Sequence, residues 1–325
     1  MAIPLHEFYN SDTIGNAHMS GTSYYLPKPE LVGDALLKLI ASVRKKYGSY
    51  DDYQMAAAVG LPLEIYVGRL AWANSQHRDK MRTWGLATPL TITGNAMIVG
   101  DIHVPFTDWE YTSLVTKVAE KHLQPPRQLI IAGDYFNLDI FSDYAKMVAG
   151  PNWHDEKTAA VALMQEWAGV FDKIYLLSGN HDRRVSRRTD GEMDITDLAD
   201  FLSISANILT PSILGYATLE SGGVSWRVTH AKEYSINRLT VAGELALKFQ
   251  SHIVSFHEHH QAIGWDRFYR YCIVNGGSLV RQQDMAYCSL DDTKRPVWNT
   301  GFVMVREGTP YLFGKSPITA WADWL

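Results

Sequence analysis

The sequence predicts a mixed α/β sandwich preceded by a small helical domain. Short apolar runs alternate with helical stretches from about residue 96 onward, and such alternation is typical of packed sheets and helices. The preceding part shows helical periodicity only, and Gly85, Pro89 and Gly94 separate the two parts. We therefore place one domain over residues 1–90 and a second over residues 91–325.

Eight apolar runs in the second domain have the length of strands, and two longer stretches have that of helices. The expected strands are residues 96–99, 128–132, 173–177, 225–229, 252–255, 271–274, 301–305 and 310–313. The expected helices are residues 109–122 and 157–171.

The first domain begins with a polar segment to about Tyr25, which we expect to be an irregular arm. Leu36, Leu39 and Ile40 have helical spacing, and this helix should end in the basic, Gly-containing stretch 45–48. Two further helices are expected over 53–59 and 63–74. They fit either a packed helical hairpin, which we favour, or a DNA-binding helix-turn-helix.

The composition is that of an ordinary globular protein, with 46% hydrophobic and 20% charged residues among 325. A formal charge of −5 argues against a wholly basic nucleic-acid binder but allows a local basic patch. The two cysteines, Cys272 and Cys288, disfavour a disulfide framework and a cysteine-ligated zinc site. With no signal-peptide features and no apolar run near the ~20 residues that span a bilayer, we expect a cytoplasmic protein without a membrane partner. The oligomeric state stays open.

Five of the expected strands end in residues that can bind metal ions or phosphate. Side chains at the carboxyl ends of strands converge on one crevice, and residues two apart in extended chain face the same way. Alone, each Asp would be read as a turn former and each His as a partly buried structural residue. Together their order favours a metal site, and oxygen and imidazole ligands without sulfur suit Mn, Fe, Zn or Ni. The residues are Asp101, His103, Asp134, Asn180, His181, Asp182, His230, His257 and His259.

There are ligands here for more than one ion, and Asp134 is the carboxylate best placed to bridge two. The ordered blocks Asp-x-His, Gly-Asp, Gly-Asn-His-Asp, His and His-x-His resemble the motifs of the calcineurin-like metallophosphoesterase superfamily. The segment Val-Asn-Gly-Gly-Ser at 274–278 resembles the part of that family that follows its last ligand strand. The resemblance runs from about Ala96 to the end of the chain. It implies a four-layer α/β/β/α sandwich with the metal site at the strand ends.

The resemblance also implies a role for each residue. Asp101, His103 and His259 would bind one ion, Asn180, His230 and His257 a second, and Asp134 both. His181, oriented by Asp182, would stabilise or protonate the leaving oxygen. Two divalent ions, Mn first with Fe, Zn or Ni as alternatives, would lower the pKa of a bridging water, whose hydroxide attacks phosphorus in line.

The chain departs from the family pattern at two neighbouring positions. Phe256 stands where the last block usually has glycine. His260 has no family role, and we expect it at the surface.

Arginines follow the third block closely, at Arg183, Arg184 and Arg187. They are candidates for binding a nucleotide, polyphosphate or nucleic-acid backbone, since the guanidinium can donate two hydrogen bonds to phosphate. The alternative is a solvated helix start paired with nearby acidic residues. Those acidic residues are Asp190, Glu192 and Asp194.

Aromatic residues in the expected loops are candidates for stacking on a base, although core packing explains most aromatic side chains. These residues are Tyr135, Phe136, Tyr144 and Trp153.

Three functions are compatible with this sequence. The first is a metal-dependent phosphodiesterase or nuclease-like enzyme acting on a nucleotide or on DNA. The second is a phosphomonoesterase for small phosphorylated substrates or protein phosphate. The third is a non-catalytic scaffold, which need not keep a complete ligand set. The arginines and the helix-turn-helix alternative favour the first.

Overall fold

The computed structural model describes residues 33–47, 50–70, 72–73, 88–142, 150–285, 288 and 298–315. The chain divides into two compact units, Met1–Ala87 and Thr88–Leu325, close to the domain division expected from the sequence. The expected N-terminal arm lies outside the described residues. None of the helices described could cross a membrane.

The first unit contains the expected helices. Helix α1 spans Gly33–Tyr47, α2 spans Asp52–Val59, and residues 63–70 are also helical. A capping box begins α2, because Asp51 accepts a hydrogen bond from the Gln54 amide while the Gln54 side chain accepts one from the Asp51 amide. These three helices share a small hydrophobic core, which stabilises them against one another. The helix-turn-helix alternative stays a prediction.

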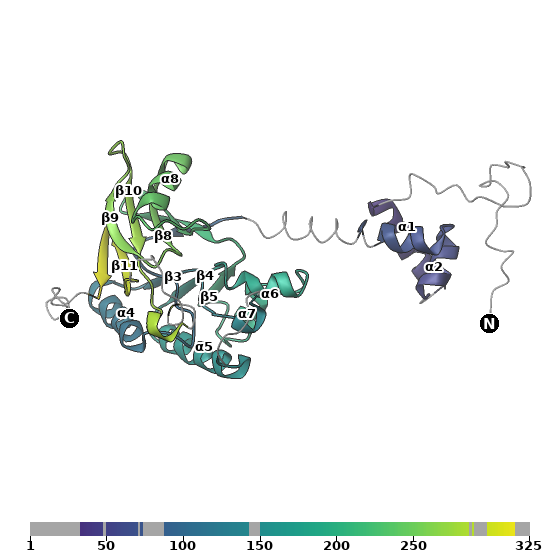
Figure 1. Cartoon of the computed structure of the whole chain (residues 1–325), viewed down its shortest axis with the longest axis horizontal. Helices are drawn as coiled ribbons and strands as arrows, with labels where there is room; N and C mark the ends of the chain where they lie inside the picture. The colour runs from purple at the N-terminus through teal and green to yellow at the C-terminus, as the bar shows by residue number, and fades with distance from the viewer. Residues whose placement is uncertain are drawn as a thin grey trace, which may run out of the picture. The chain divides into compact units, whose positions relative to one another are not determined.

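The described part of the second unit contains two six-stranded sheets (Figure 1). The first sheet is built from β2 (Ala96–Val99), β3 (Gln128–Ala132), β4 (Lys173–Leu177), β5 (Leu209–Ser212), β11 (Gly301–Arg306) and β12 (Thr309–Gly314). Its strand order is β12-β11-β2-β3-β4-β5. The second sheet is built from β1 (Leu90–Thr93), β6 (Tyr216–Ser221), β7 (Val224–His230), β8 (His252–Phe256), β9 (Gln261–Trp265) and β10 (Cys272–Gly276). Its order is β1-β6-β7-β8-β10-β9.

Helices cover the outer faces of both sheets. They are α4 (Trp109–His122), α5 (Trp153–Ala168), α6 (Arg183–Arg188), α7 (Ile195–Asp200) and α8 (Thr240–Phe249), with 3-10 turns η3 (Asp139–Phe141) and η4 (Gln282–Asp284). In Figure 1, α4, α5 and α7 lie along the first sheet, and α8 lies against the second.

Alternation along β2 shows how the layers pack. Met97 belongs to the hydrophobic cluster that includes Val115 of α4, whereas the next residue, Ile98, belongs to the cluster that includes Val228 of β7. Successive side chains of a strand point to opposite faces, so one face of this sheet meets helices and the other meets the second sheet. A separate cluster joins α8 to the outer face of the second sheet. The expected four-layer α/β/β/α sandwich is confirmed.

Four strands were not predicted from the sequence, namely β1, β5, β6 and β9. Three of these lie at sheet edges. Edge strands are half exposed and tolerate polar residues and proline, such as Pro211 in β5, so their apolar signal is weak. Helix α5 also begins before the predicted residue 157, because the Asn152 side chain accepts a hydrogen bond from the Asp155 amide and caps the helix there.

Candidate metal centre

The five loops expected to carry ligands meet at one edge of the sandwich. Those after β2, β3 and β4 come from the first sheet, and those after β7 and β8 come from the second. Several of their residues have positive φ, which is uncommon for residues other than glycine and concentrates at functional sites. These residues are Asp101 (50°), His103 (49°), Asp134 (51°), His257 (96°) and His259 (56°).

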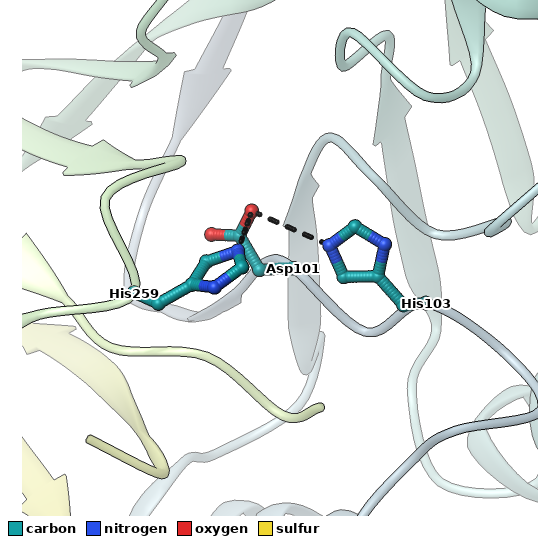
Figure 2. A group of neighbouring side chains, drawn as sticks. All are labelled: Asp101, His103 and His259. Atoms are coloured by element: carbon teal, nitrogen blue, oxygen red, sulfur yellow. Dashed lines mark ion pairs between the residues drawn. The ribbon is translucent and has the colours of Figure 1, made fainter. Parts of the chain in front are cut away.

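Three groups of three side chains each present ligand atoms within 4.8 Å of one another, and one of them, His103, Asp134 and His181, overlaps the other two. Asp101, His103 and His259 form the first group. The Asp101 Oδ1 atom lies 3.2 Å from His259 Nε2 and 3.9 Å from His103 Nε2. Figure 2 draws these two contacts as dashed lines. Asp134, His230 and His257 form the second group.

Each carboxylate is held by the backbone of another ligand loop. The His257 amide donates to Asp101 Oδ2 at 2.8 Å, and the His181 amide donates to Asp134 Oδ1 at 2.8 Å. The second oxygen of each carboxylate is thereby directed into the site. Asp134 Oδ2 lies 3.7 Å from His103 Nε2 and 3.4 Å from His230 Nε2, between the two groups. This position is the one that a bridging ligand needs.

The hydrogen-bond pattern tests whether these residues fit metal ions. His230 Nδ1 lies 3.0 Å from the Ala132 carbonyl, which can only accept, so Nδ1 carries the proton of a neutral ring. The lone pair of His230 Nε2 then faces Asn180 Oδ1 at 2.9 Å and Asp134 Oδ2 at 3.4 Å. Three acceptors that converge in this way suit a cation placed between them.

Buried polar atoms in the first group lead to the same conclusion. Asp101 Oδ1 and both ring nitrogens of His103 are buried and accept or donate no hydrogen bond among the residues described. Such atoms are costly to bury unless an ion satisfies them. Carboxylate, amide and imidazole donors without thiolate fit divalent ions such as Mn, Fe, Zn or Ni.

Burial dominates the electrostatics of these groups. It raises the pKa of Asp134 to about 7, although the His230 charge acts in the opposite direction. It lowers the pKa of His103 to about 3. Burial also acts to lower the pKa of His230, but the neighbouring carboxylates Asp134 and Asp101 outweigh it, so that pKa is raised. A cation among these groups would favour ionised carboxylates and neutral imidazoles.

His181 lies beside the metal groups, with its ring centroid 4.4 Å from that of His103. Its Nδ1 is 2.8 Å from the Asn137 carbonyl, and its Nε2 is 3.1 Å from Arg184 Nη2. A carbonyl only accepts and a guanidinium only donates, so the assigned state has the proton on Nδ1 and the lone pair on Nε2. Burial and the charges of His103 and Arg184 hold the pKa of His181 well below its usual value.

Asp182 does not orient the His181 ring, so the predicted role was wrong. Its carboxylate accepts hydrogen bonds from the backbone amides of Asp134 (2.8 Å), Gly179 (2.8 Å) and Phe136 (3.1 Å). These bonds fix the loop that carries Asp134. The Asn137 carbonyl orients the ring instead.

The candidate arginines lie on or beside α6 but differ in environment. Arg184 is largely buried and donates to Asp139 Oδ1 at 2.9 Å and to the Asn137 carbonyl at 2.8 Å. Its acidic partner is therefore Asp139 and none of the three acidic residues considered from the sequence. Arg183 and Arg187 are exposed beside the His181 loop.

The aromatic candidates for base stacking were mostly wrong. Tyr135 and Phe136 are fully buried, and Trp153 packs between Phe136 and Phe201. Their position after a ligand strand gave no information on burial, which depends on tertiary packing. Tyr144 lies outside the described residues.

The two departures from the family pattern are both buried. His260 is 1% exposed, so the expectation of a surface position was wrong. The Phe256 ring lies against Gly100 and Gly276, and a Cβ on Gly100 would fall 2.6 Å from Phe256 Cδ1. Two glycines facing the ring thus make room for the bulk that replaces the family's glycine.

The comparison with protein families agrees with this geometry. The calcineurin-like phosphoesterase family matches residues 95–282, more than half of the chain. The chain belongs to this family. The resemblance noted in the sequence is confirmed, and with it the sandwich; members of this family are generally hydrolases. The identity of the metal and the substrate do not follow from membership.

Comparison with individual proteins adds little to the family assignment. No curated protein matches the chain. Among solved structures, protein PH1004 of Pyrococcus horikoshii OT3 is 8% identical, with 69% of this chain and 88% of that one covered and a TM-score of 0.43. Vps29 of Chaetomium thermophilum is 10% identical, with 68% and 97% covered and a TM-score of 0.35. Vps29 of Entamoeba histolytica, complexed with Zn²⁺, is 10% identical, with 68% and 98% covered and a TM-score of 0.31. These values are too low to inform the function of this calcineurin-like phosphoesterase.

Sequence reasoning missed two residues of this phosphoesterase centre. Asn137 acts through its main-chain carbonyl, so its side-chain type gave no signal. The Trp298 ring lies edge-on to His259, with centroids 4.0 Å apart. It is nearly forty residues from this ligand in sequence, and no motif connects the two.

Proposed function

We propose that this calcineurin-like phosphoesterase hydrolyses phosphodiester bonds of nucleotides or nucleic acids, using two divalent metal ions. The observation that carries the proposal is the position of Asp134 Oδ2 between His103 Nε2 at 3.7 Å and His230 Nε2 at 3.4 Å. One carboxylate oxygen is thus shared by two ligand groups. When bound, two ions at such a site activate water and stabilise the charge on phosphoryl oxygens.

The ligand sets follow from the two groups. Asp101, His103 and His259 would hold one ion, and Asp134 would hold both. Asn180, His230 and His257 would complete the second set, with Asn180 placed by the 2.9 Å approach of its Oδ1 to His230 Nε2. Mn is our first choice of metal.

Residues of the chain itself would stabilise and protonate the leaving group. The Asn137 carbonyl holds His181 by Nδ1, so Nε2 is the atom that can exchange a proton with the leaving oxygen. Donation from Nε2 requires the charged ring, which burial and Arg184 disfavour. A phosphoester anion beside the ring opposes both effects and raises this pKa. Arg184 Nη2, 3.1 Å from Nε2, can then donate to a substrate oxygen.

Two features support a diester of a nucleic acid over a small monoester. Arg183 and Arg187 are exposed next to the site, in a chain whose formal charge is −5. A local concentration of guanidinium groups on an otherwise acidic chain suits an extended phosphate backbone.

The test compares substrates on metal-stripped protein supplied in turn with Mn, Zn, Ni or Mg. We expect Mn-dependent hydrolysis of bis-(p-nitrophenyl) phosphate and of single-stranded DNA, and loss of both in His181→Asn with unchanged metal content. Hydrolysis of p-nitrophenyl phosphate alone would replace the proposal with a phosphomonoesterase. Two bound ions without any hydrolysis would instead identify a scaffold.

A further inference from the structure

The hairpin between β9 and β10 exposes an unusual set of apolar side chains. Ile263 and Trp265 are each 50% exposed, Phe268 is 57% exposed and Tyr269 is 80% exposed. The rings of Trp265 and Tyr269 are stacked, with centroids 5.9 Å apart and planes 10° from parallel. Contiguous exposed apolar surface is uncommon and marks sites of interaction. We call residues 265–270 the hairpin platform.

The hairpin platform is also positively charged. Arg267 and Arg270 are exposed, and each guanidinium lies 4.9 Å from the centroid of the Phe268 ring. The only carboxylate between residues 261 and 271 is Asp266. It is buried and accepts hydrogen bonds from the amides of Phe268, Arg270 and Tyr271, at 3.0, 2.6 and 2.7 Å. The Asp266 carboxylate thus stabilises the turn, and the guanidinium groups of Arg267 and Arg270 face outward.

The turn is fixed rather than loose. Tyr269 has a φ of 58°, a conformation that bulky residues rarely adopt, and its amide donates to the Asp266 carbonyl at 2.9 Å. The Asp266 amide donates in turn to the Tyr271 carbonyl at 2.9 Å. These bonds hold Tyr269 at the tip, beside Trp265, before any partner arrives. A pre-organised surface loses less entropy on binding.

The hairpin platform lies at the end of β9 and β10 opposite to the end that carries the metal ligands. Strand β9 forms the edge of the second sheet and begins two residues after the ligand His259. At a rise of about 3.4 Å per residue, Trp265 is at most about 20 Å along the chain from His259. A few nucleotides of a single strand can cover such a distance.

We propose that the hairpin platform binds a stretch of single-stranded nucleic acid at a distance from the cleavage site, along the second sheet. Bases would stack on Trp265 and Tyr269, and phosphates would pair with Arg267 and Arg270. This inference rests on the proposed nucleic-acid phosphodiesterase. Exposed flat rings combined with cations, and no free carboxylate between them, match a partner that offers both π-faces and negative charge. A duplex hides its base faces and suits this surface less.

The experiment measures fluorescence anisotropy of labelled oligothymidine with metal-free protein in EDTA, so that binding is separated from cleavage. In the double variant Trp265→Ala/Tyr269→Ala we expect binding to weaken about tenfold or more. The variant should not weaken binding of an abasic oligomer, which has no bases to stack. The double variant Arg267→Gln/Arg270→Gln should bind more weakly, and its slope of log K against log salt should be shallower by about 1.4. Trp109→Ala, at a 40% exposed tryptophan of α4, is the matched control and should bind as wild type.

The outcomes separate this inference from the proposed function. Hydrolysis of bis-(p-nitrophenyl) phosphate should be unchanged in both double variants, which also shows that they are folded. Unchanged oligothymidine binding in both variants would overturn the inference while leaving that hydrolysis intact. Anionic vesicles bound in place of DNA, or a dimer lost on substitution, would also overturn it, in favour of a membrane or a second copy. If the wild-type protein hydrolyses no phosphodiester but the variants lose oligothymidine binding as expected, the proposed function is refuted and the binding surface is supported.

Discussion

The packing of Phe256 against Gly100 gives a prediction that the structure makes quantitative. A Cβ at residue 100 would lie 2.6 Å from Phe256 Cδ1 and 2.7 Å from Cγ, whereas carbon atoms in contact are about 3.5–4.0 Å apart. The ring is buried and cannot move away freely. We expect Gly100→Ala to lower the free energy of unfolding by about 1–3 kcal/mol, the usual effect of overpacking. Gly100 directly follows β2, and without the clash alanine there would be about 0.4–1 kcal/mol more stable than glycine, because it lowers the entropy of the unfolded chain.

A double-mutant cycle isolates this contact. Phe256→Ala alone should cost about 3–5 kcal/mol, because a buried aromatic ring is lost. Gly100→Ala/Phe256→Ala should be more stable than the sum of the single effects by about 1–3 kcal/mol, since the added methyl then meets empty space. Urea unfolding at fixed pH measures all four proteins. Additive effects would refute the reasoning, because they would show that the glycine is not needed for the ring.

Three further predictions concern the metal centre and its supports. Asp134→Ala should lose bound metal, whereas His181→Asn should keep its metal and lose turnover. Metal analysis and hydrolysis rates measure these two effects. Full metal content together with the full rate in Asp134→Ala would contradict the assignment. Asp182→Asn should destabilise the protein by about 1–3 kcal/mol in urea unfolding, because an amide cannot accept from all three backbone donors and one stays unpaired. Burial raises the pKa of Glu156 to about 7 in the folded protein, against 4.5 ordinarily, so its protonated form is favoured by folding. Its contribution to stability is present below about pH 4.5 and lost as the pH rises through about 7, and Glu156→Gln should remove this part of the pH dependence of the urea midpoint.

The sequence was most informative where a side chain's own chemistry defines its role. Asp101 and Asp134 follow strands that are largely apolar runs, and both the strands and the convergence of these side chains could be predicted from that pattern. The edge strands β1, β5 and β9 could not, because their exposed faces dilute the apolar signal. Their pairing is decided by tertiary contacts.

Roles that depend on main-chain atoms could not be predicted from the sequence either. The family resemblance implied that Asp182 orients His181, but its hydrogen bonds go to three amides in two loops. The Asn137 carbonyl orients His181 whatever its side chain. Burial misled the choice of aromatic residues in the same way, since Tyr135 follows a ligand strand and is fully buried, whereas Tyr269, in a strained turn, is 80% exposed.

The anchoring of the carboxylates implies that the metal centre and the packing of the two sheets depend on each other. Asp101 follows a strand of the first sheet, yet its Oδ2 is held by the His257 amide, which follows a strand of the second. His230, also from the second sheet, approaches Asn180 and Asp134 of the first. Any ion that binds these residues therefore joins the sheets as well as the ligands. At a free-metal concentration one hundred times its dissociation constant, one such ion would stabilise the folded state by about 2.7 kcal/mol, a large share of the stability of a typical domain. With an ion bound, the same ligand geometry would thus also hold the two halves of the sandwich together at this edge.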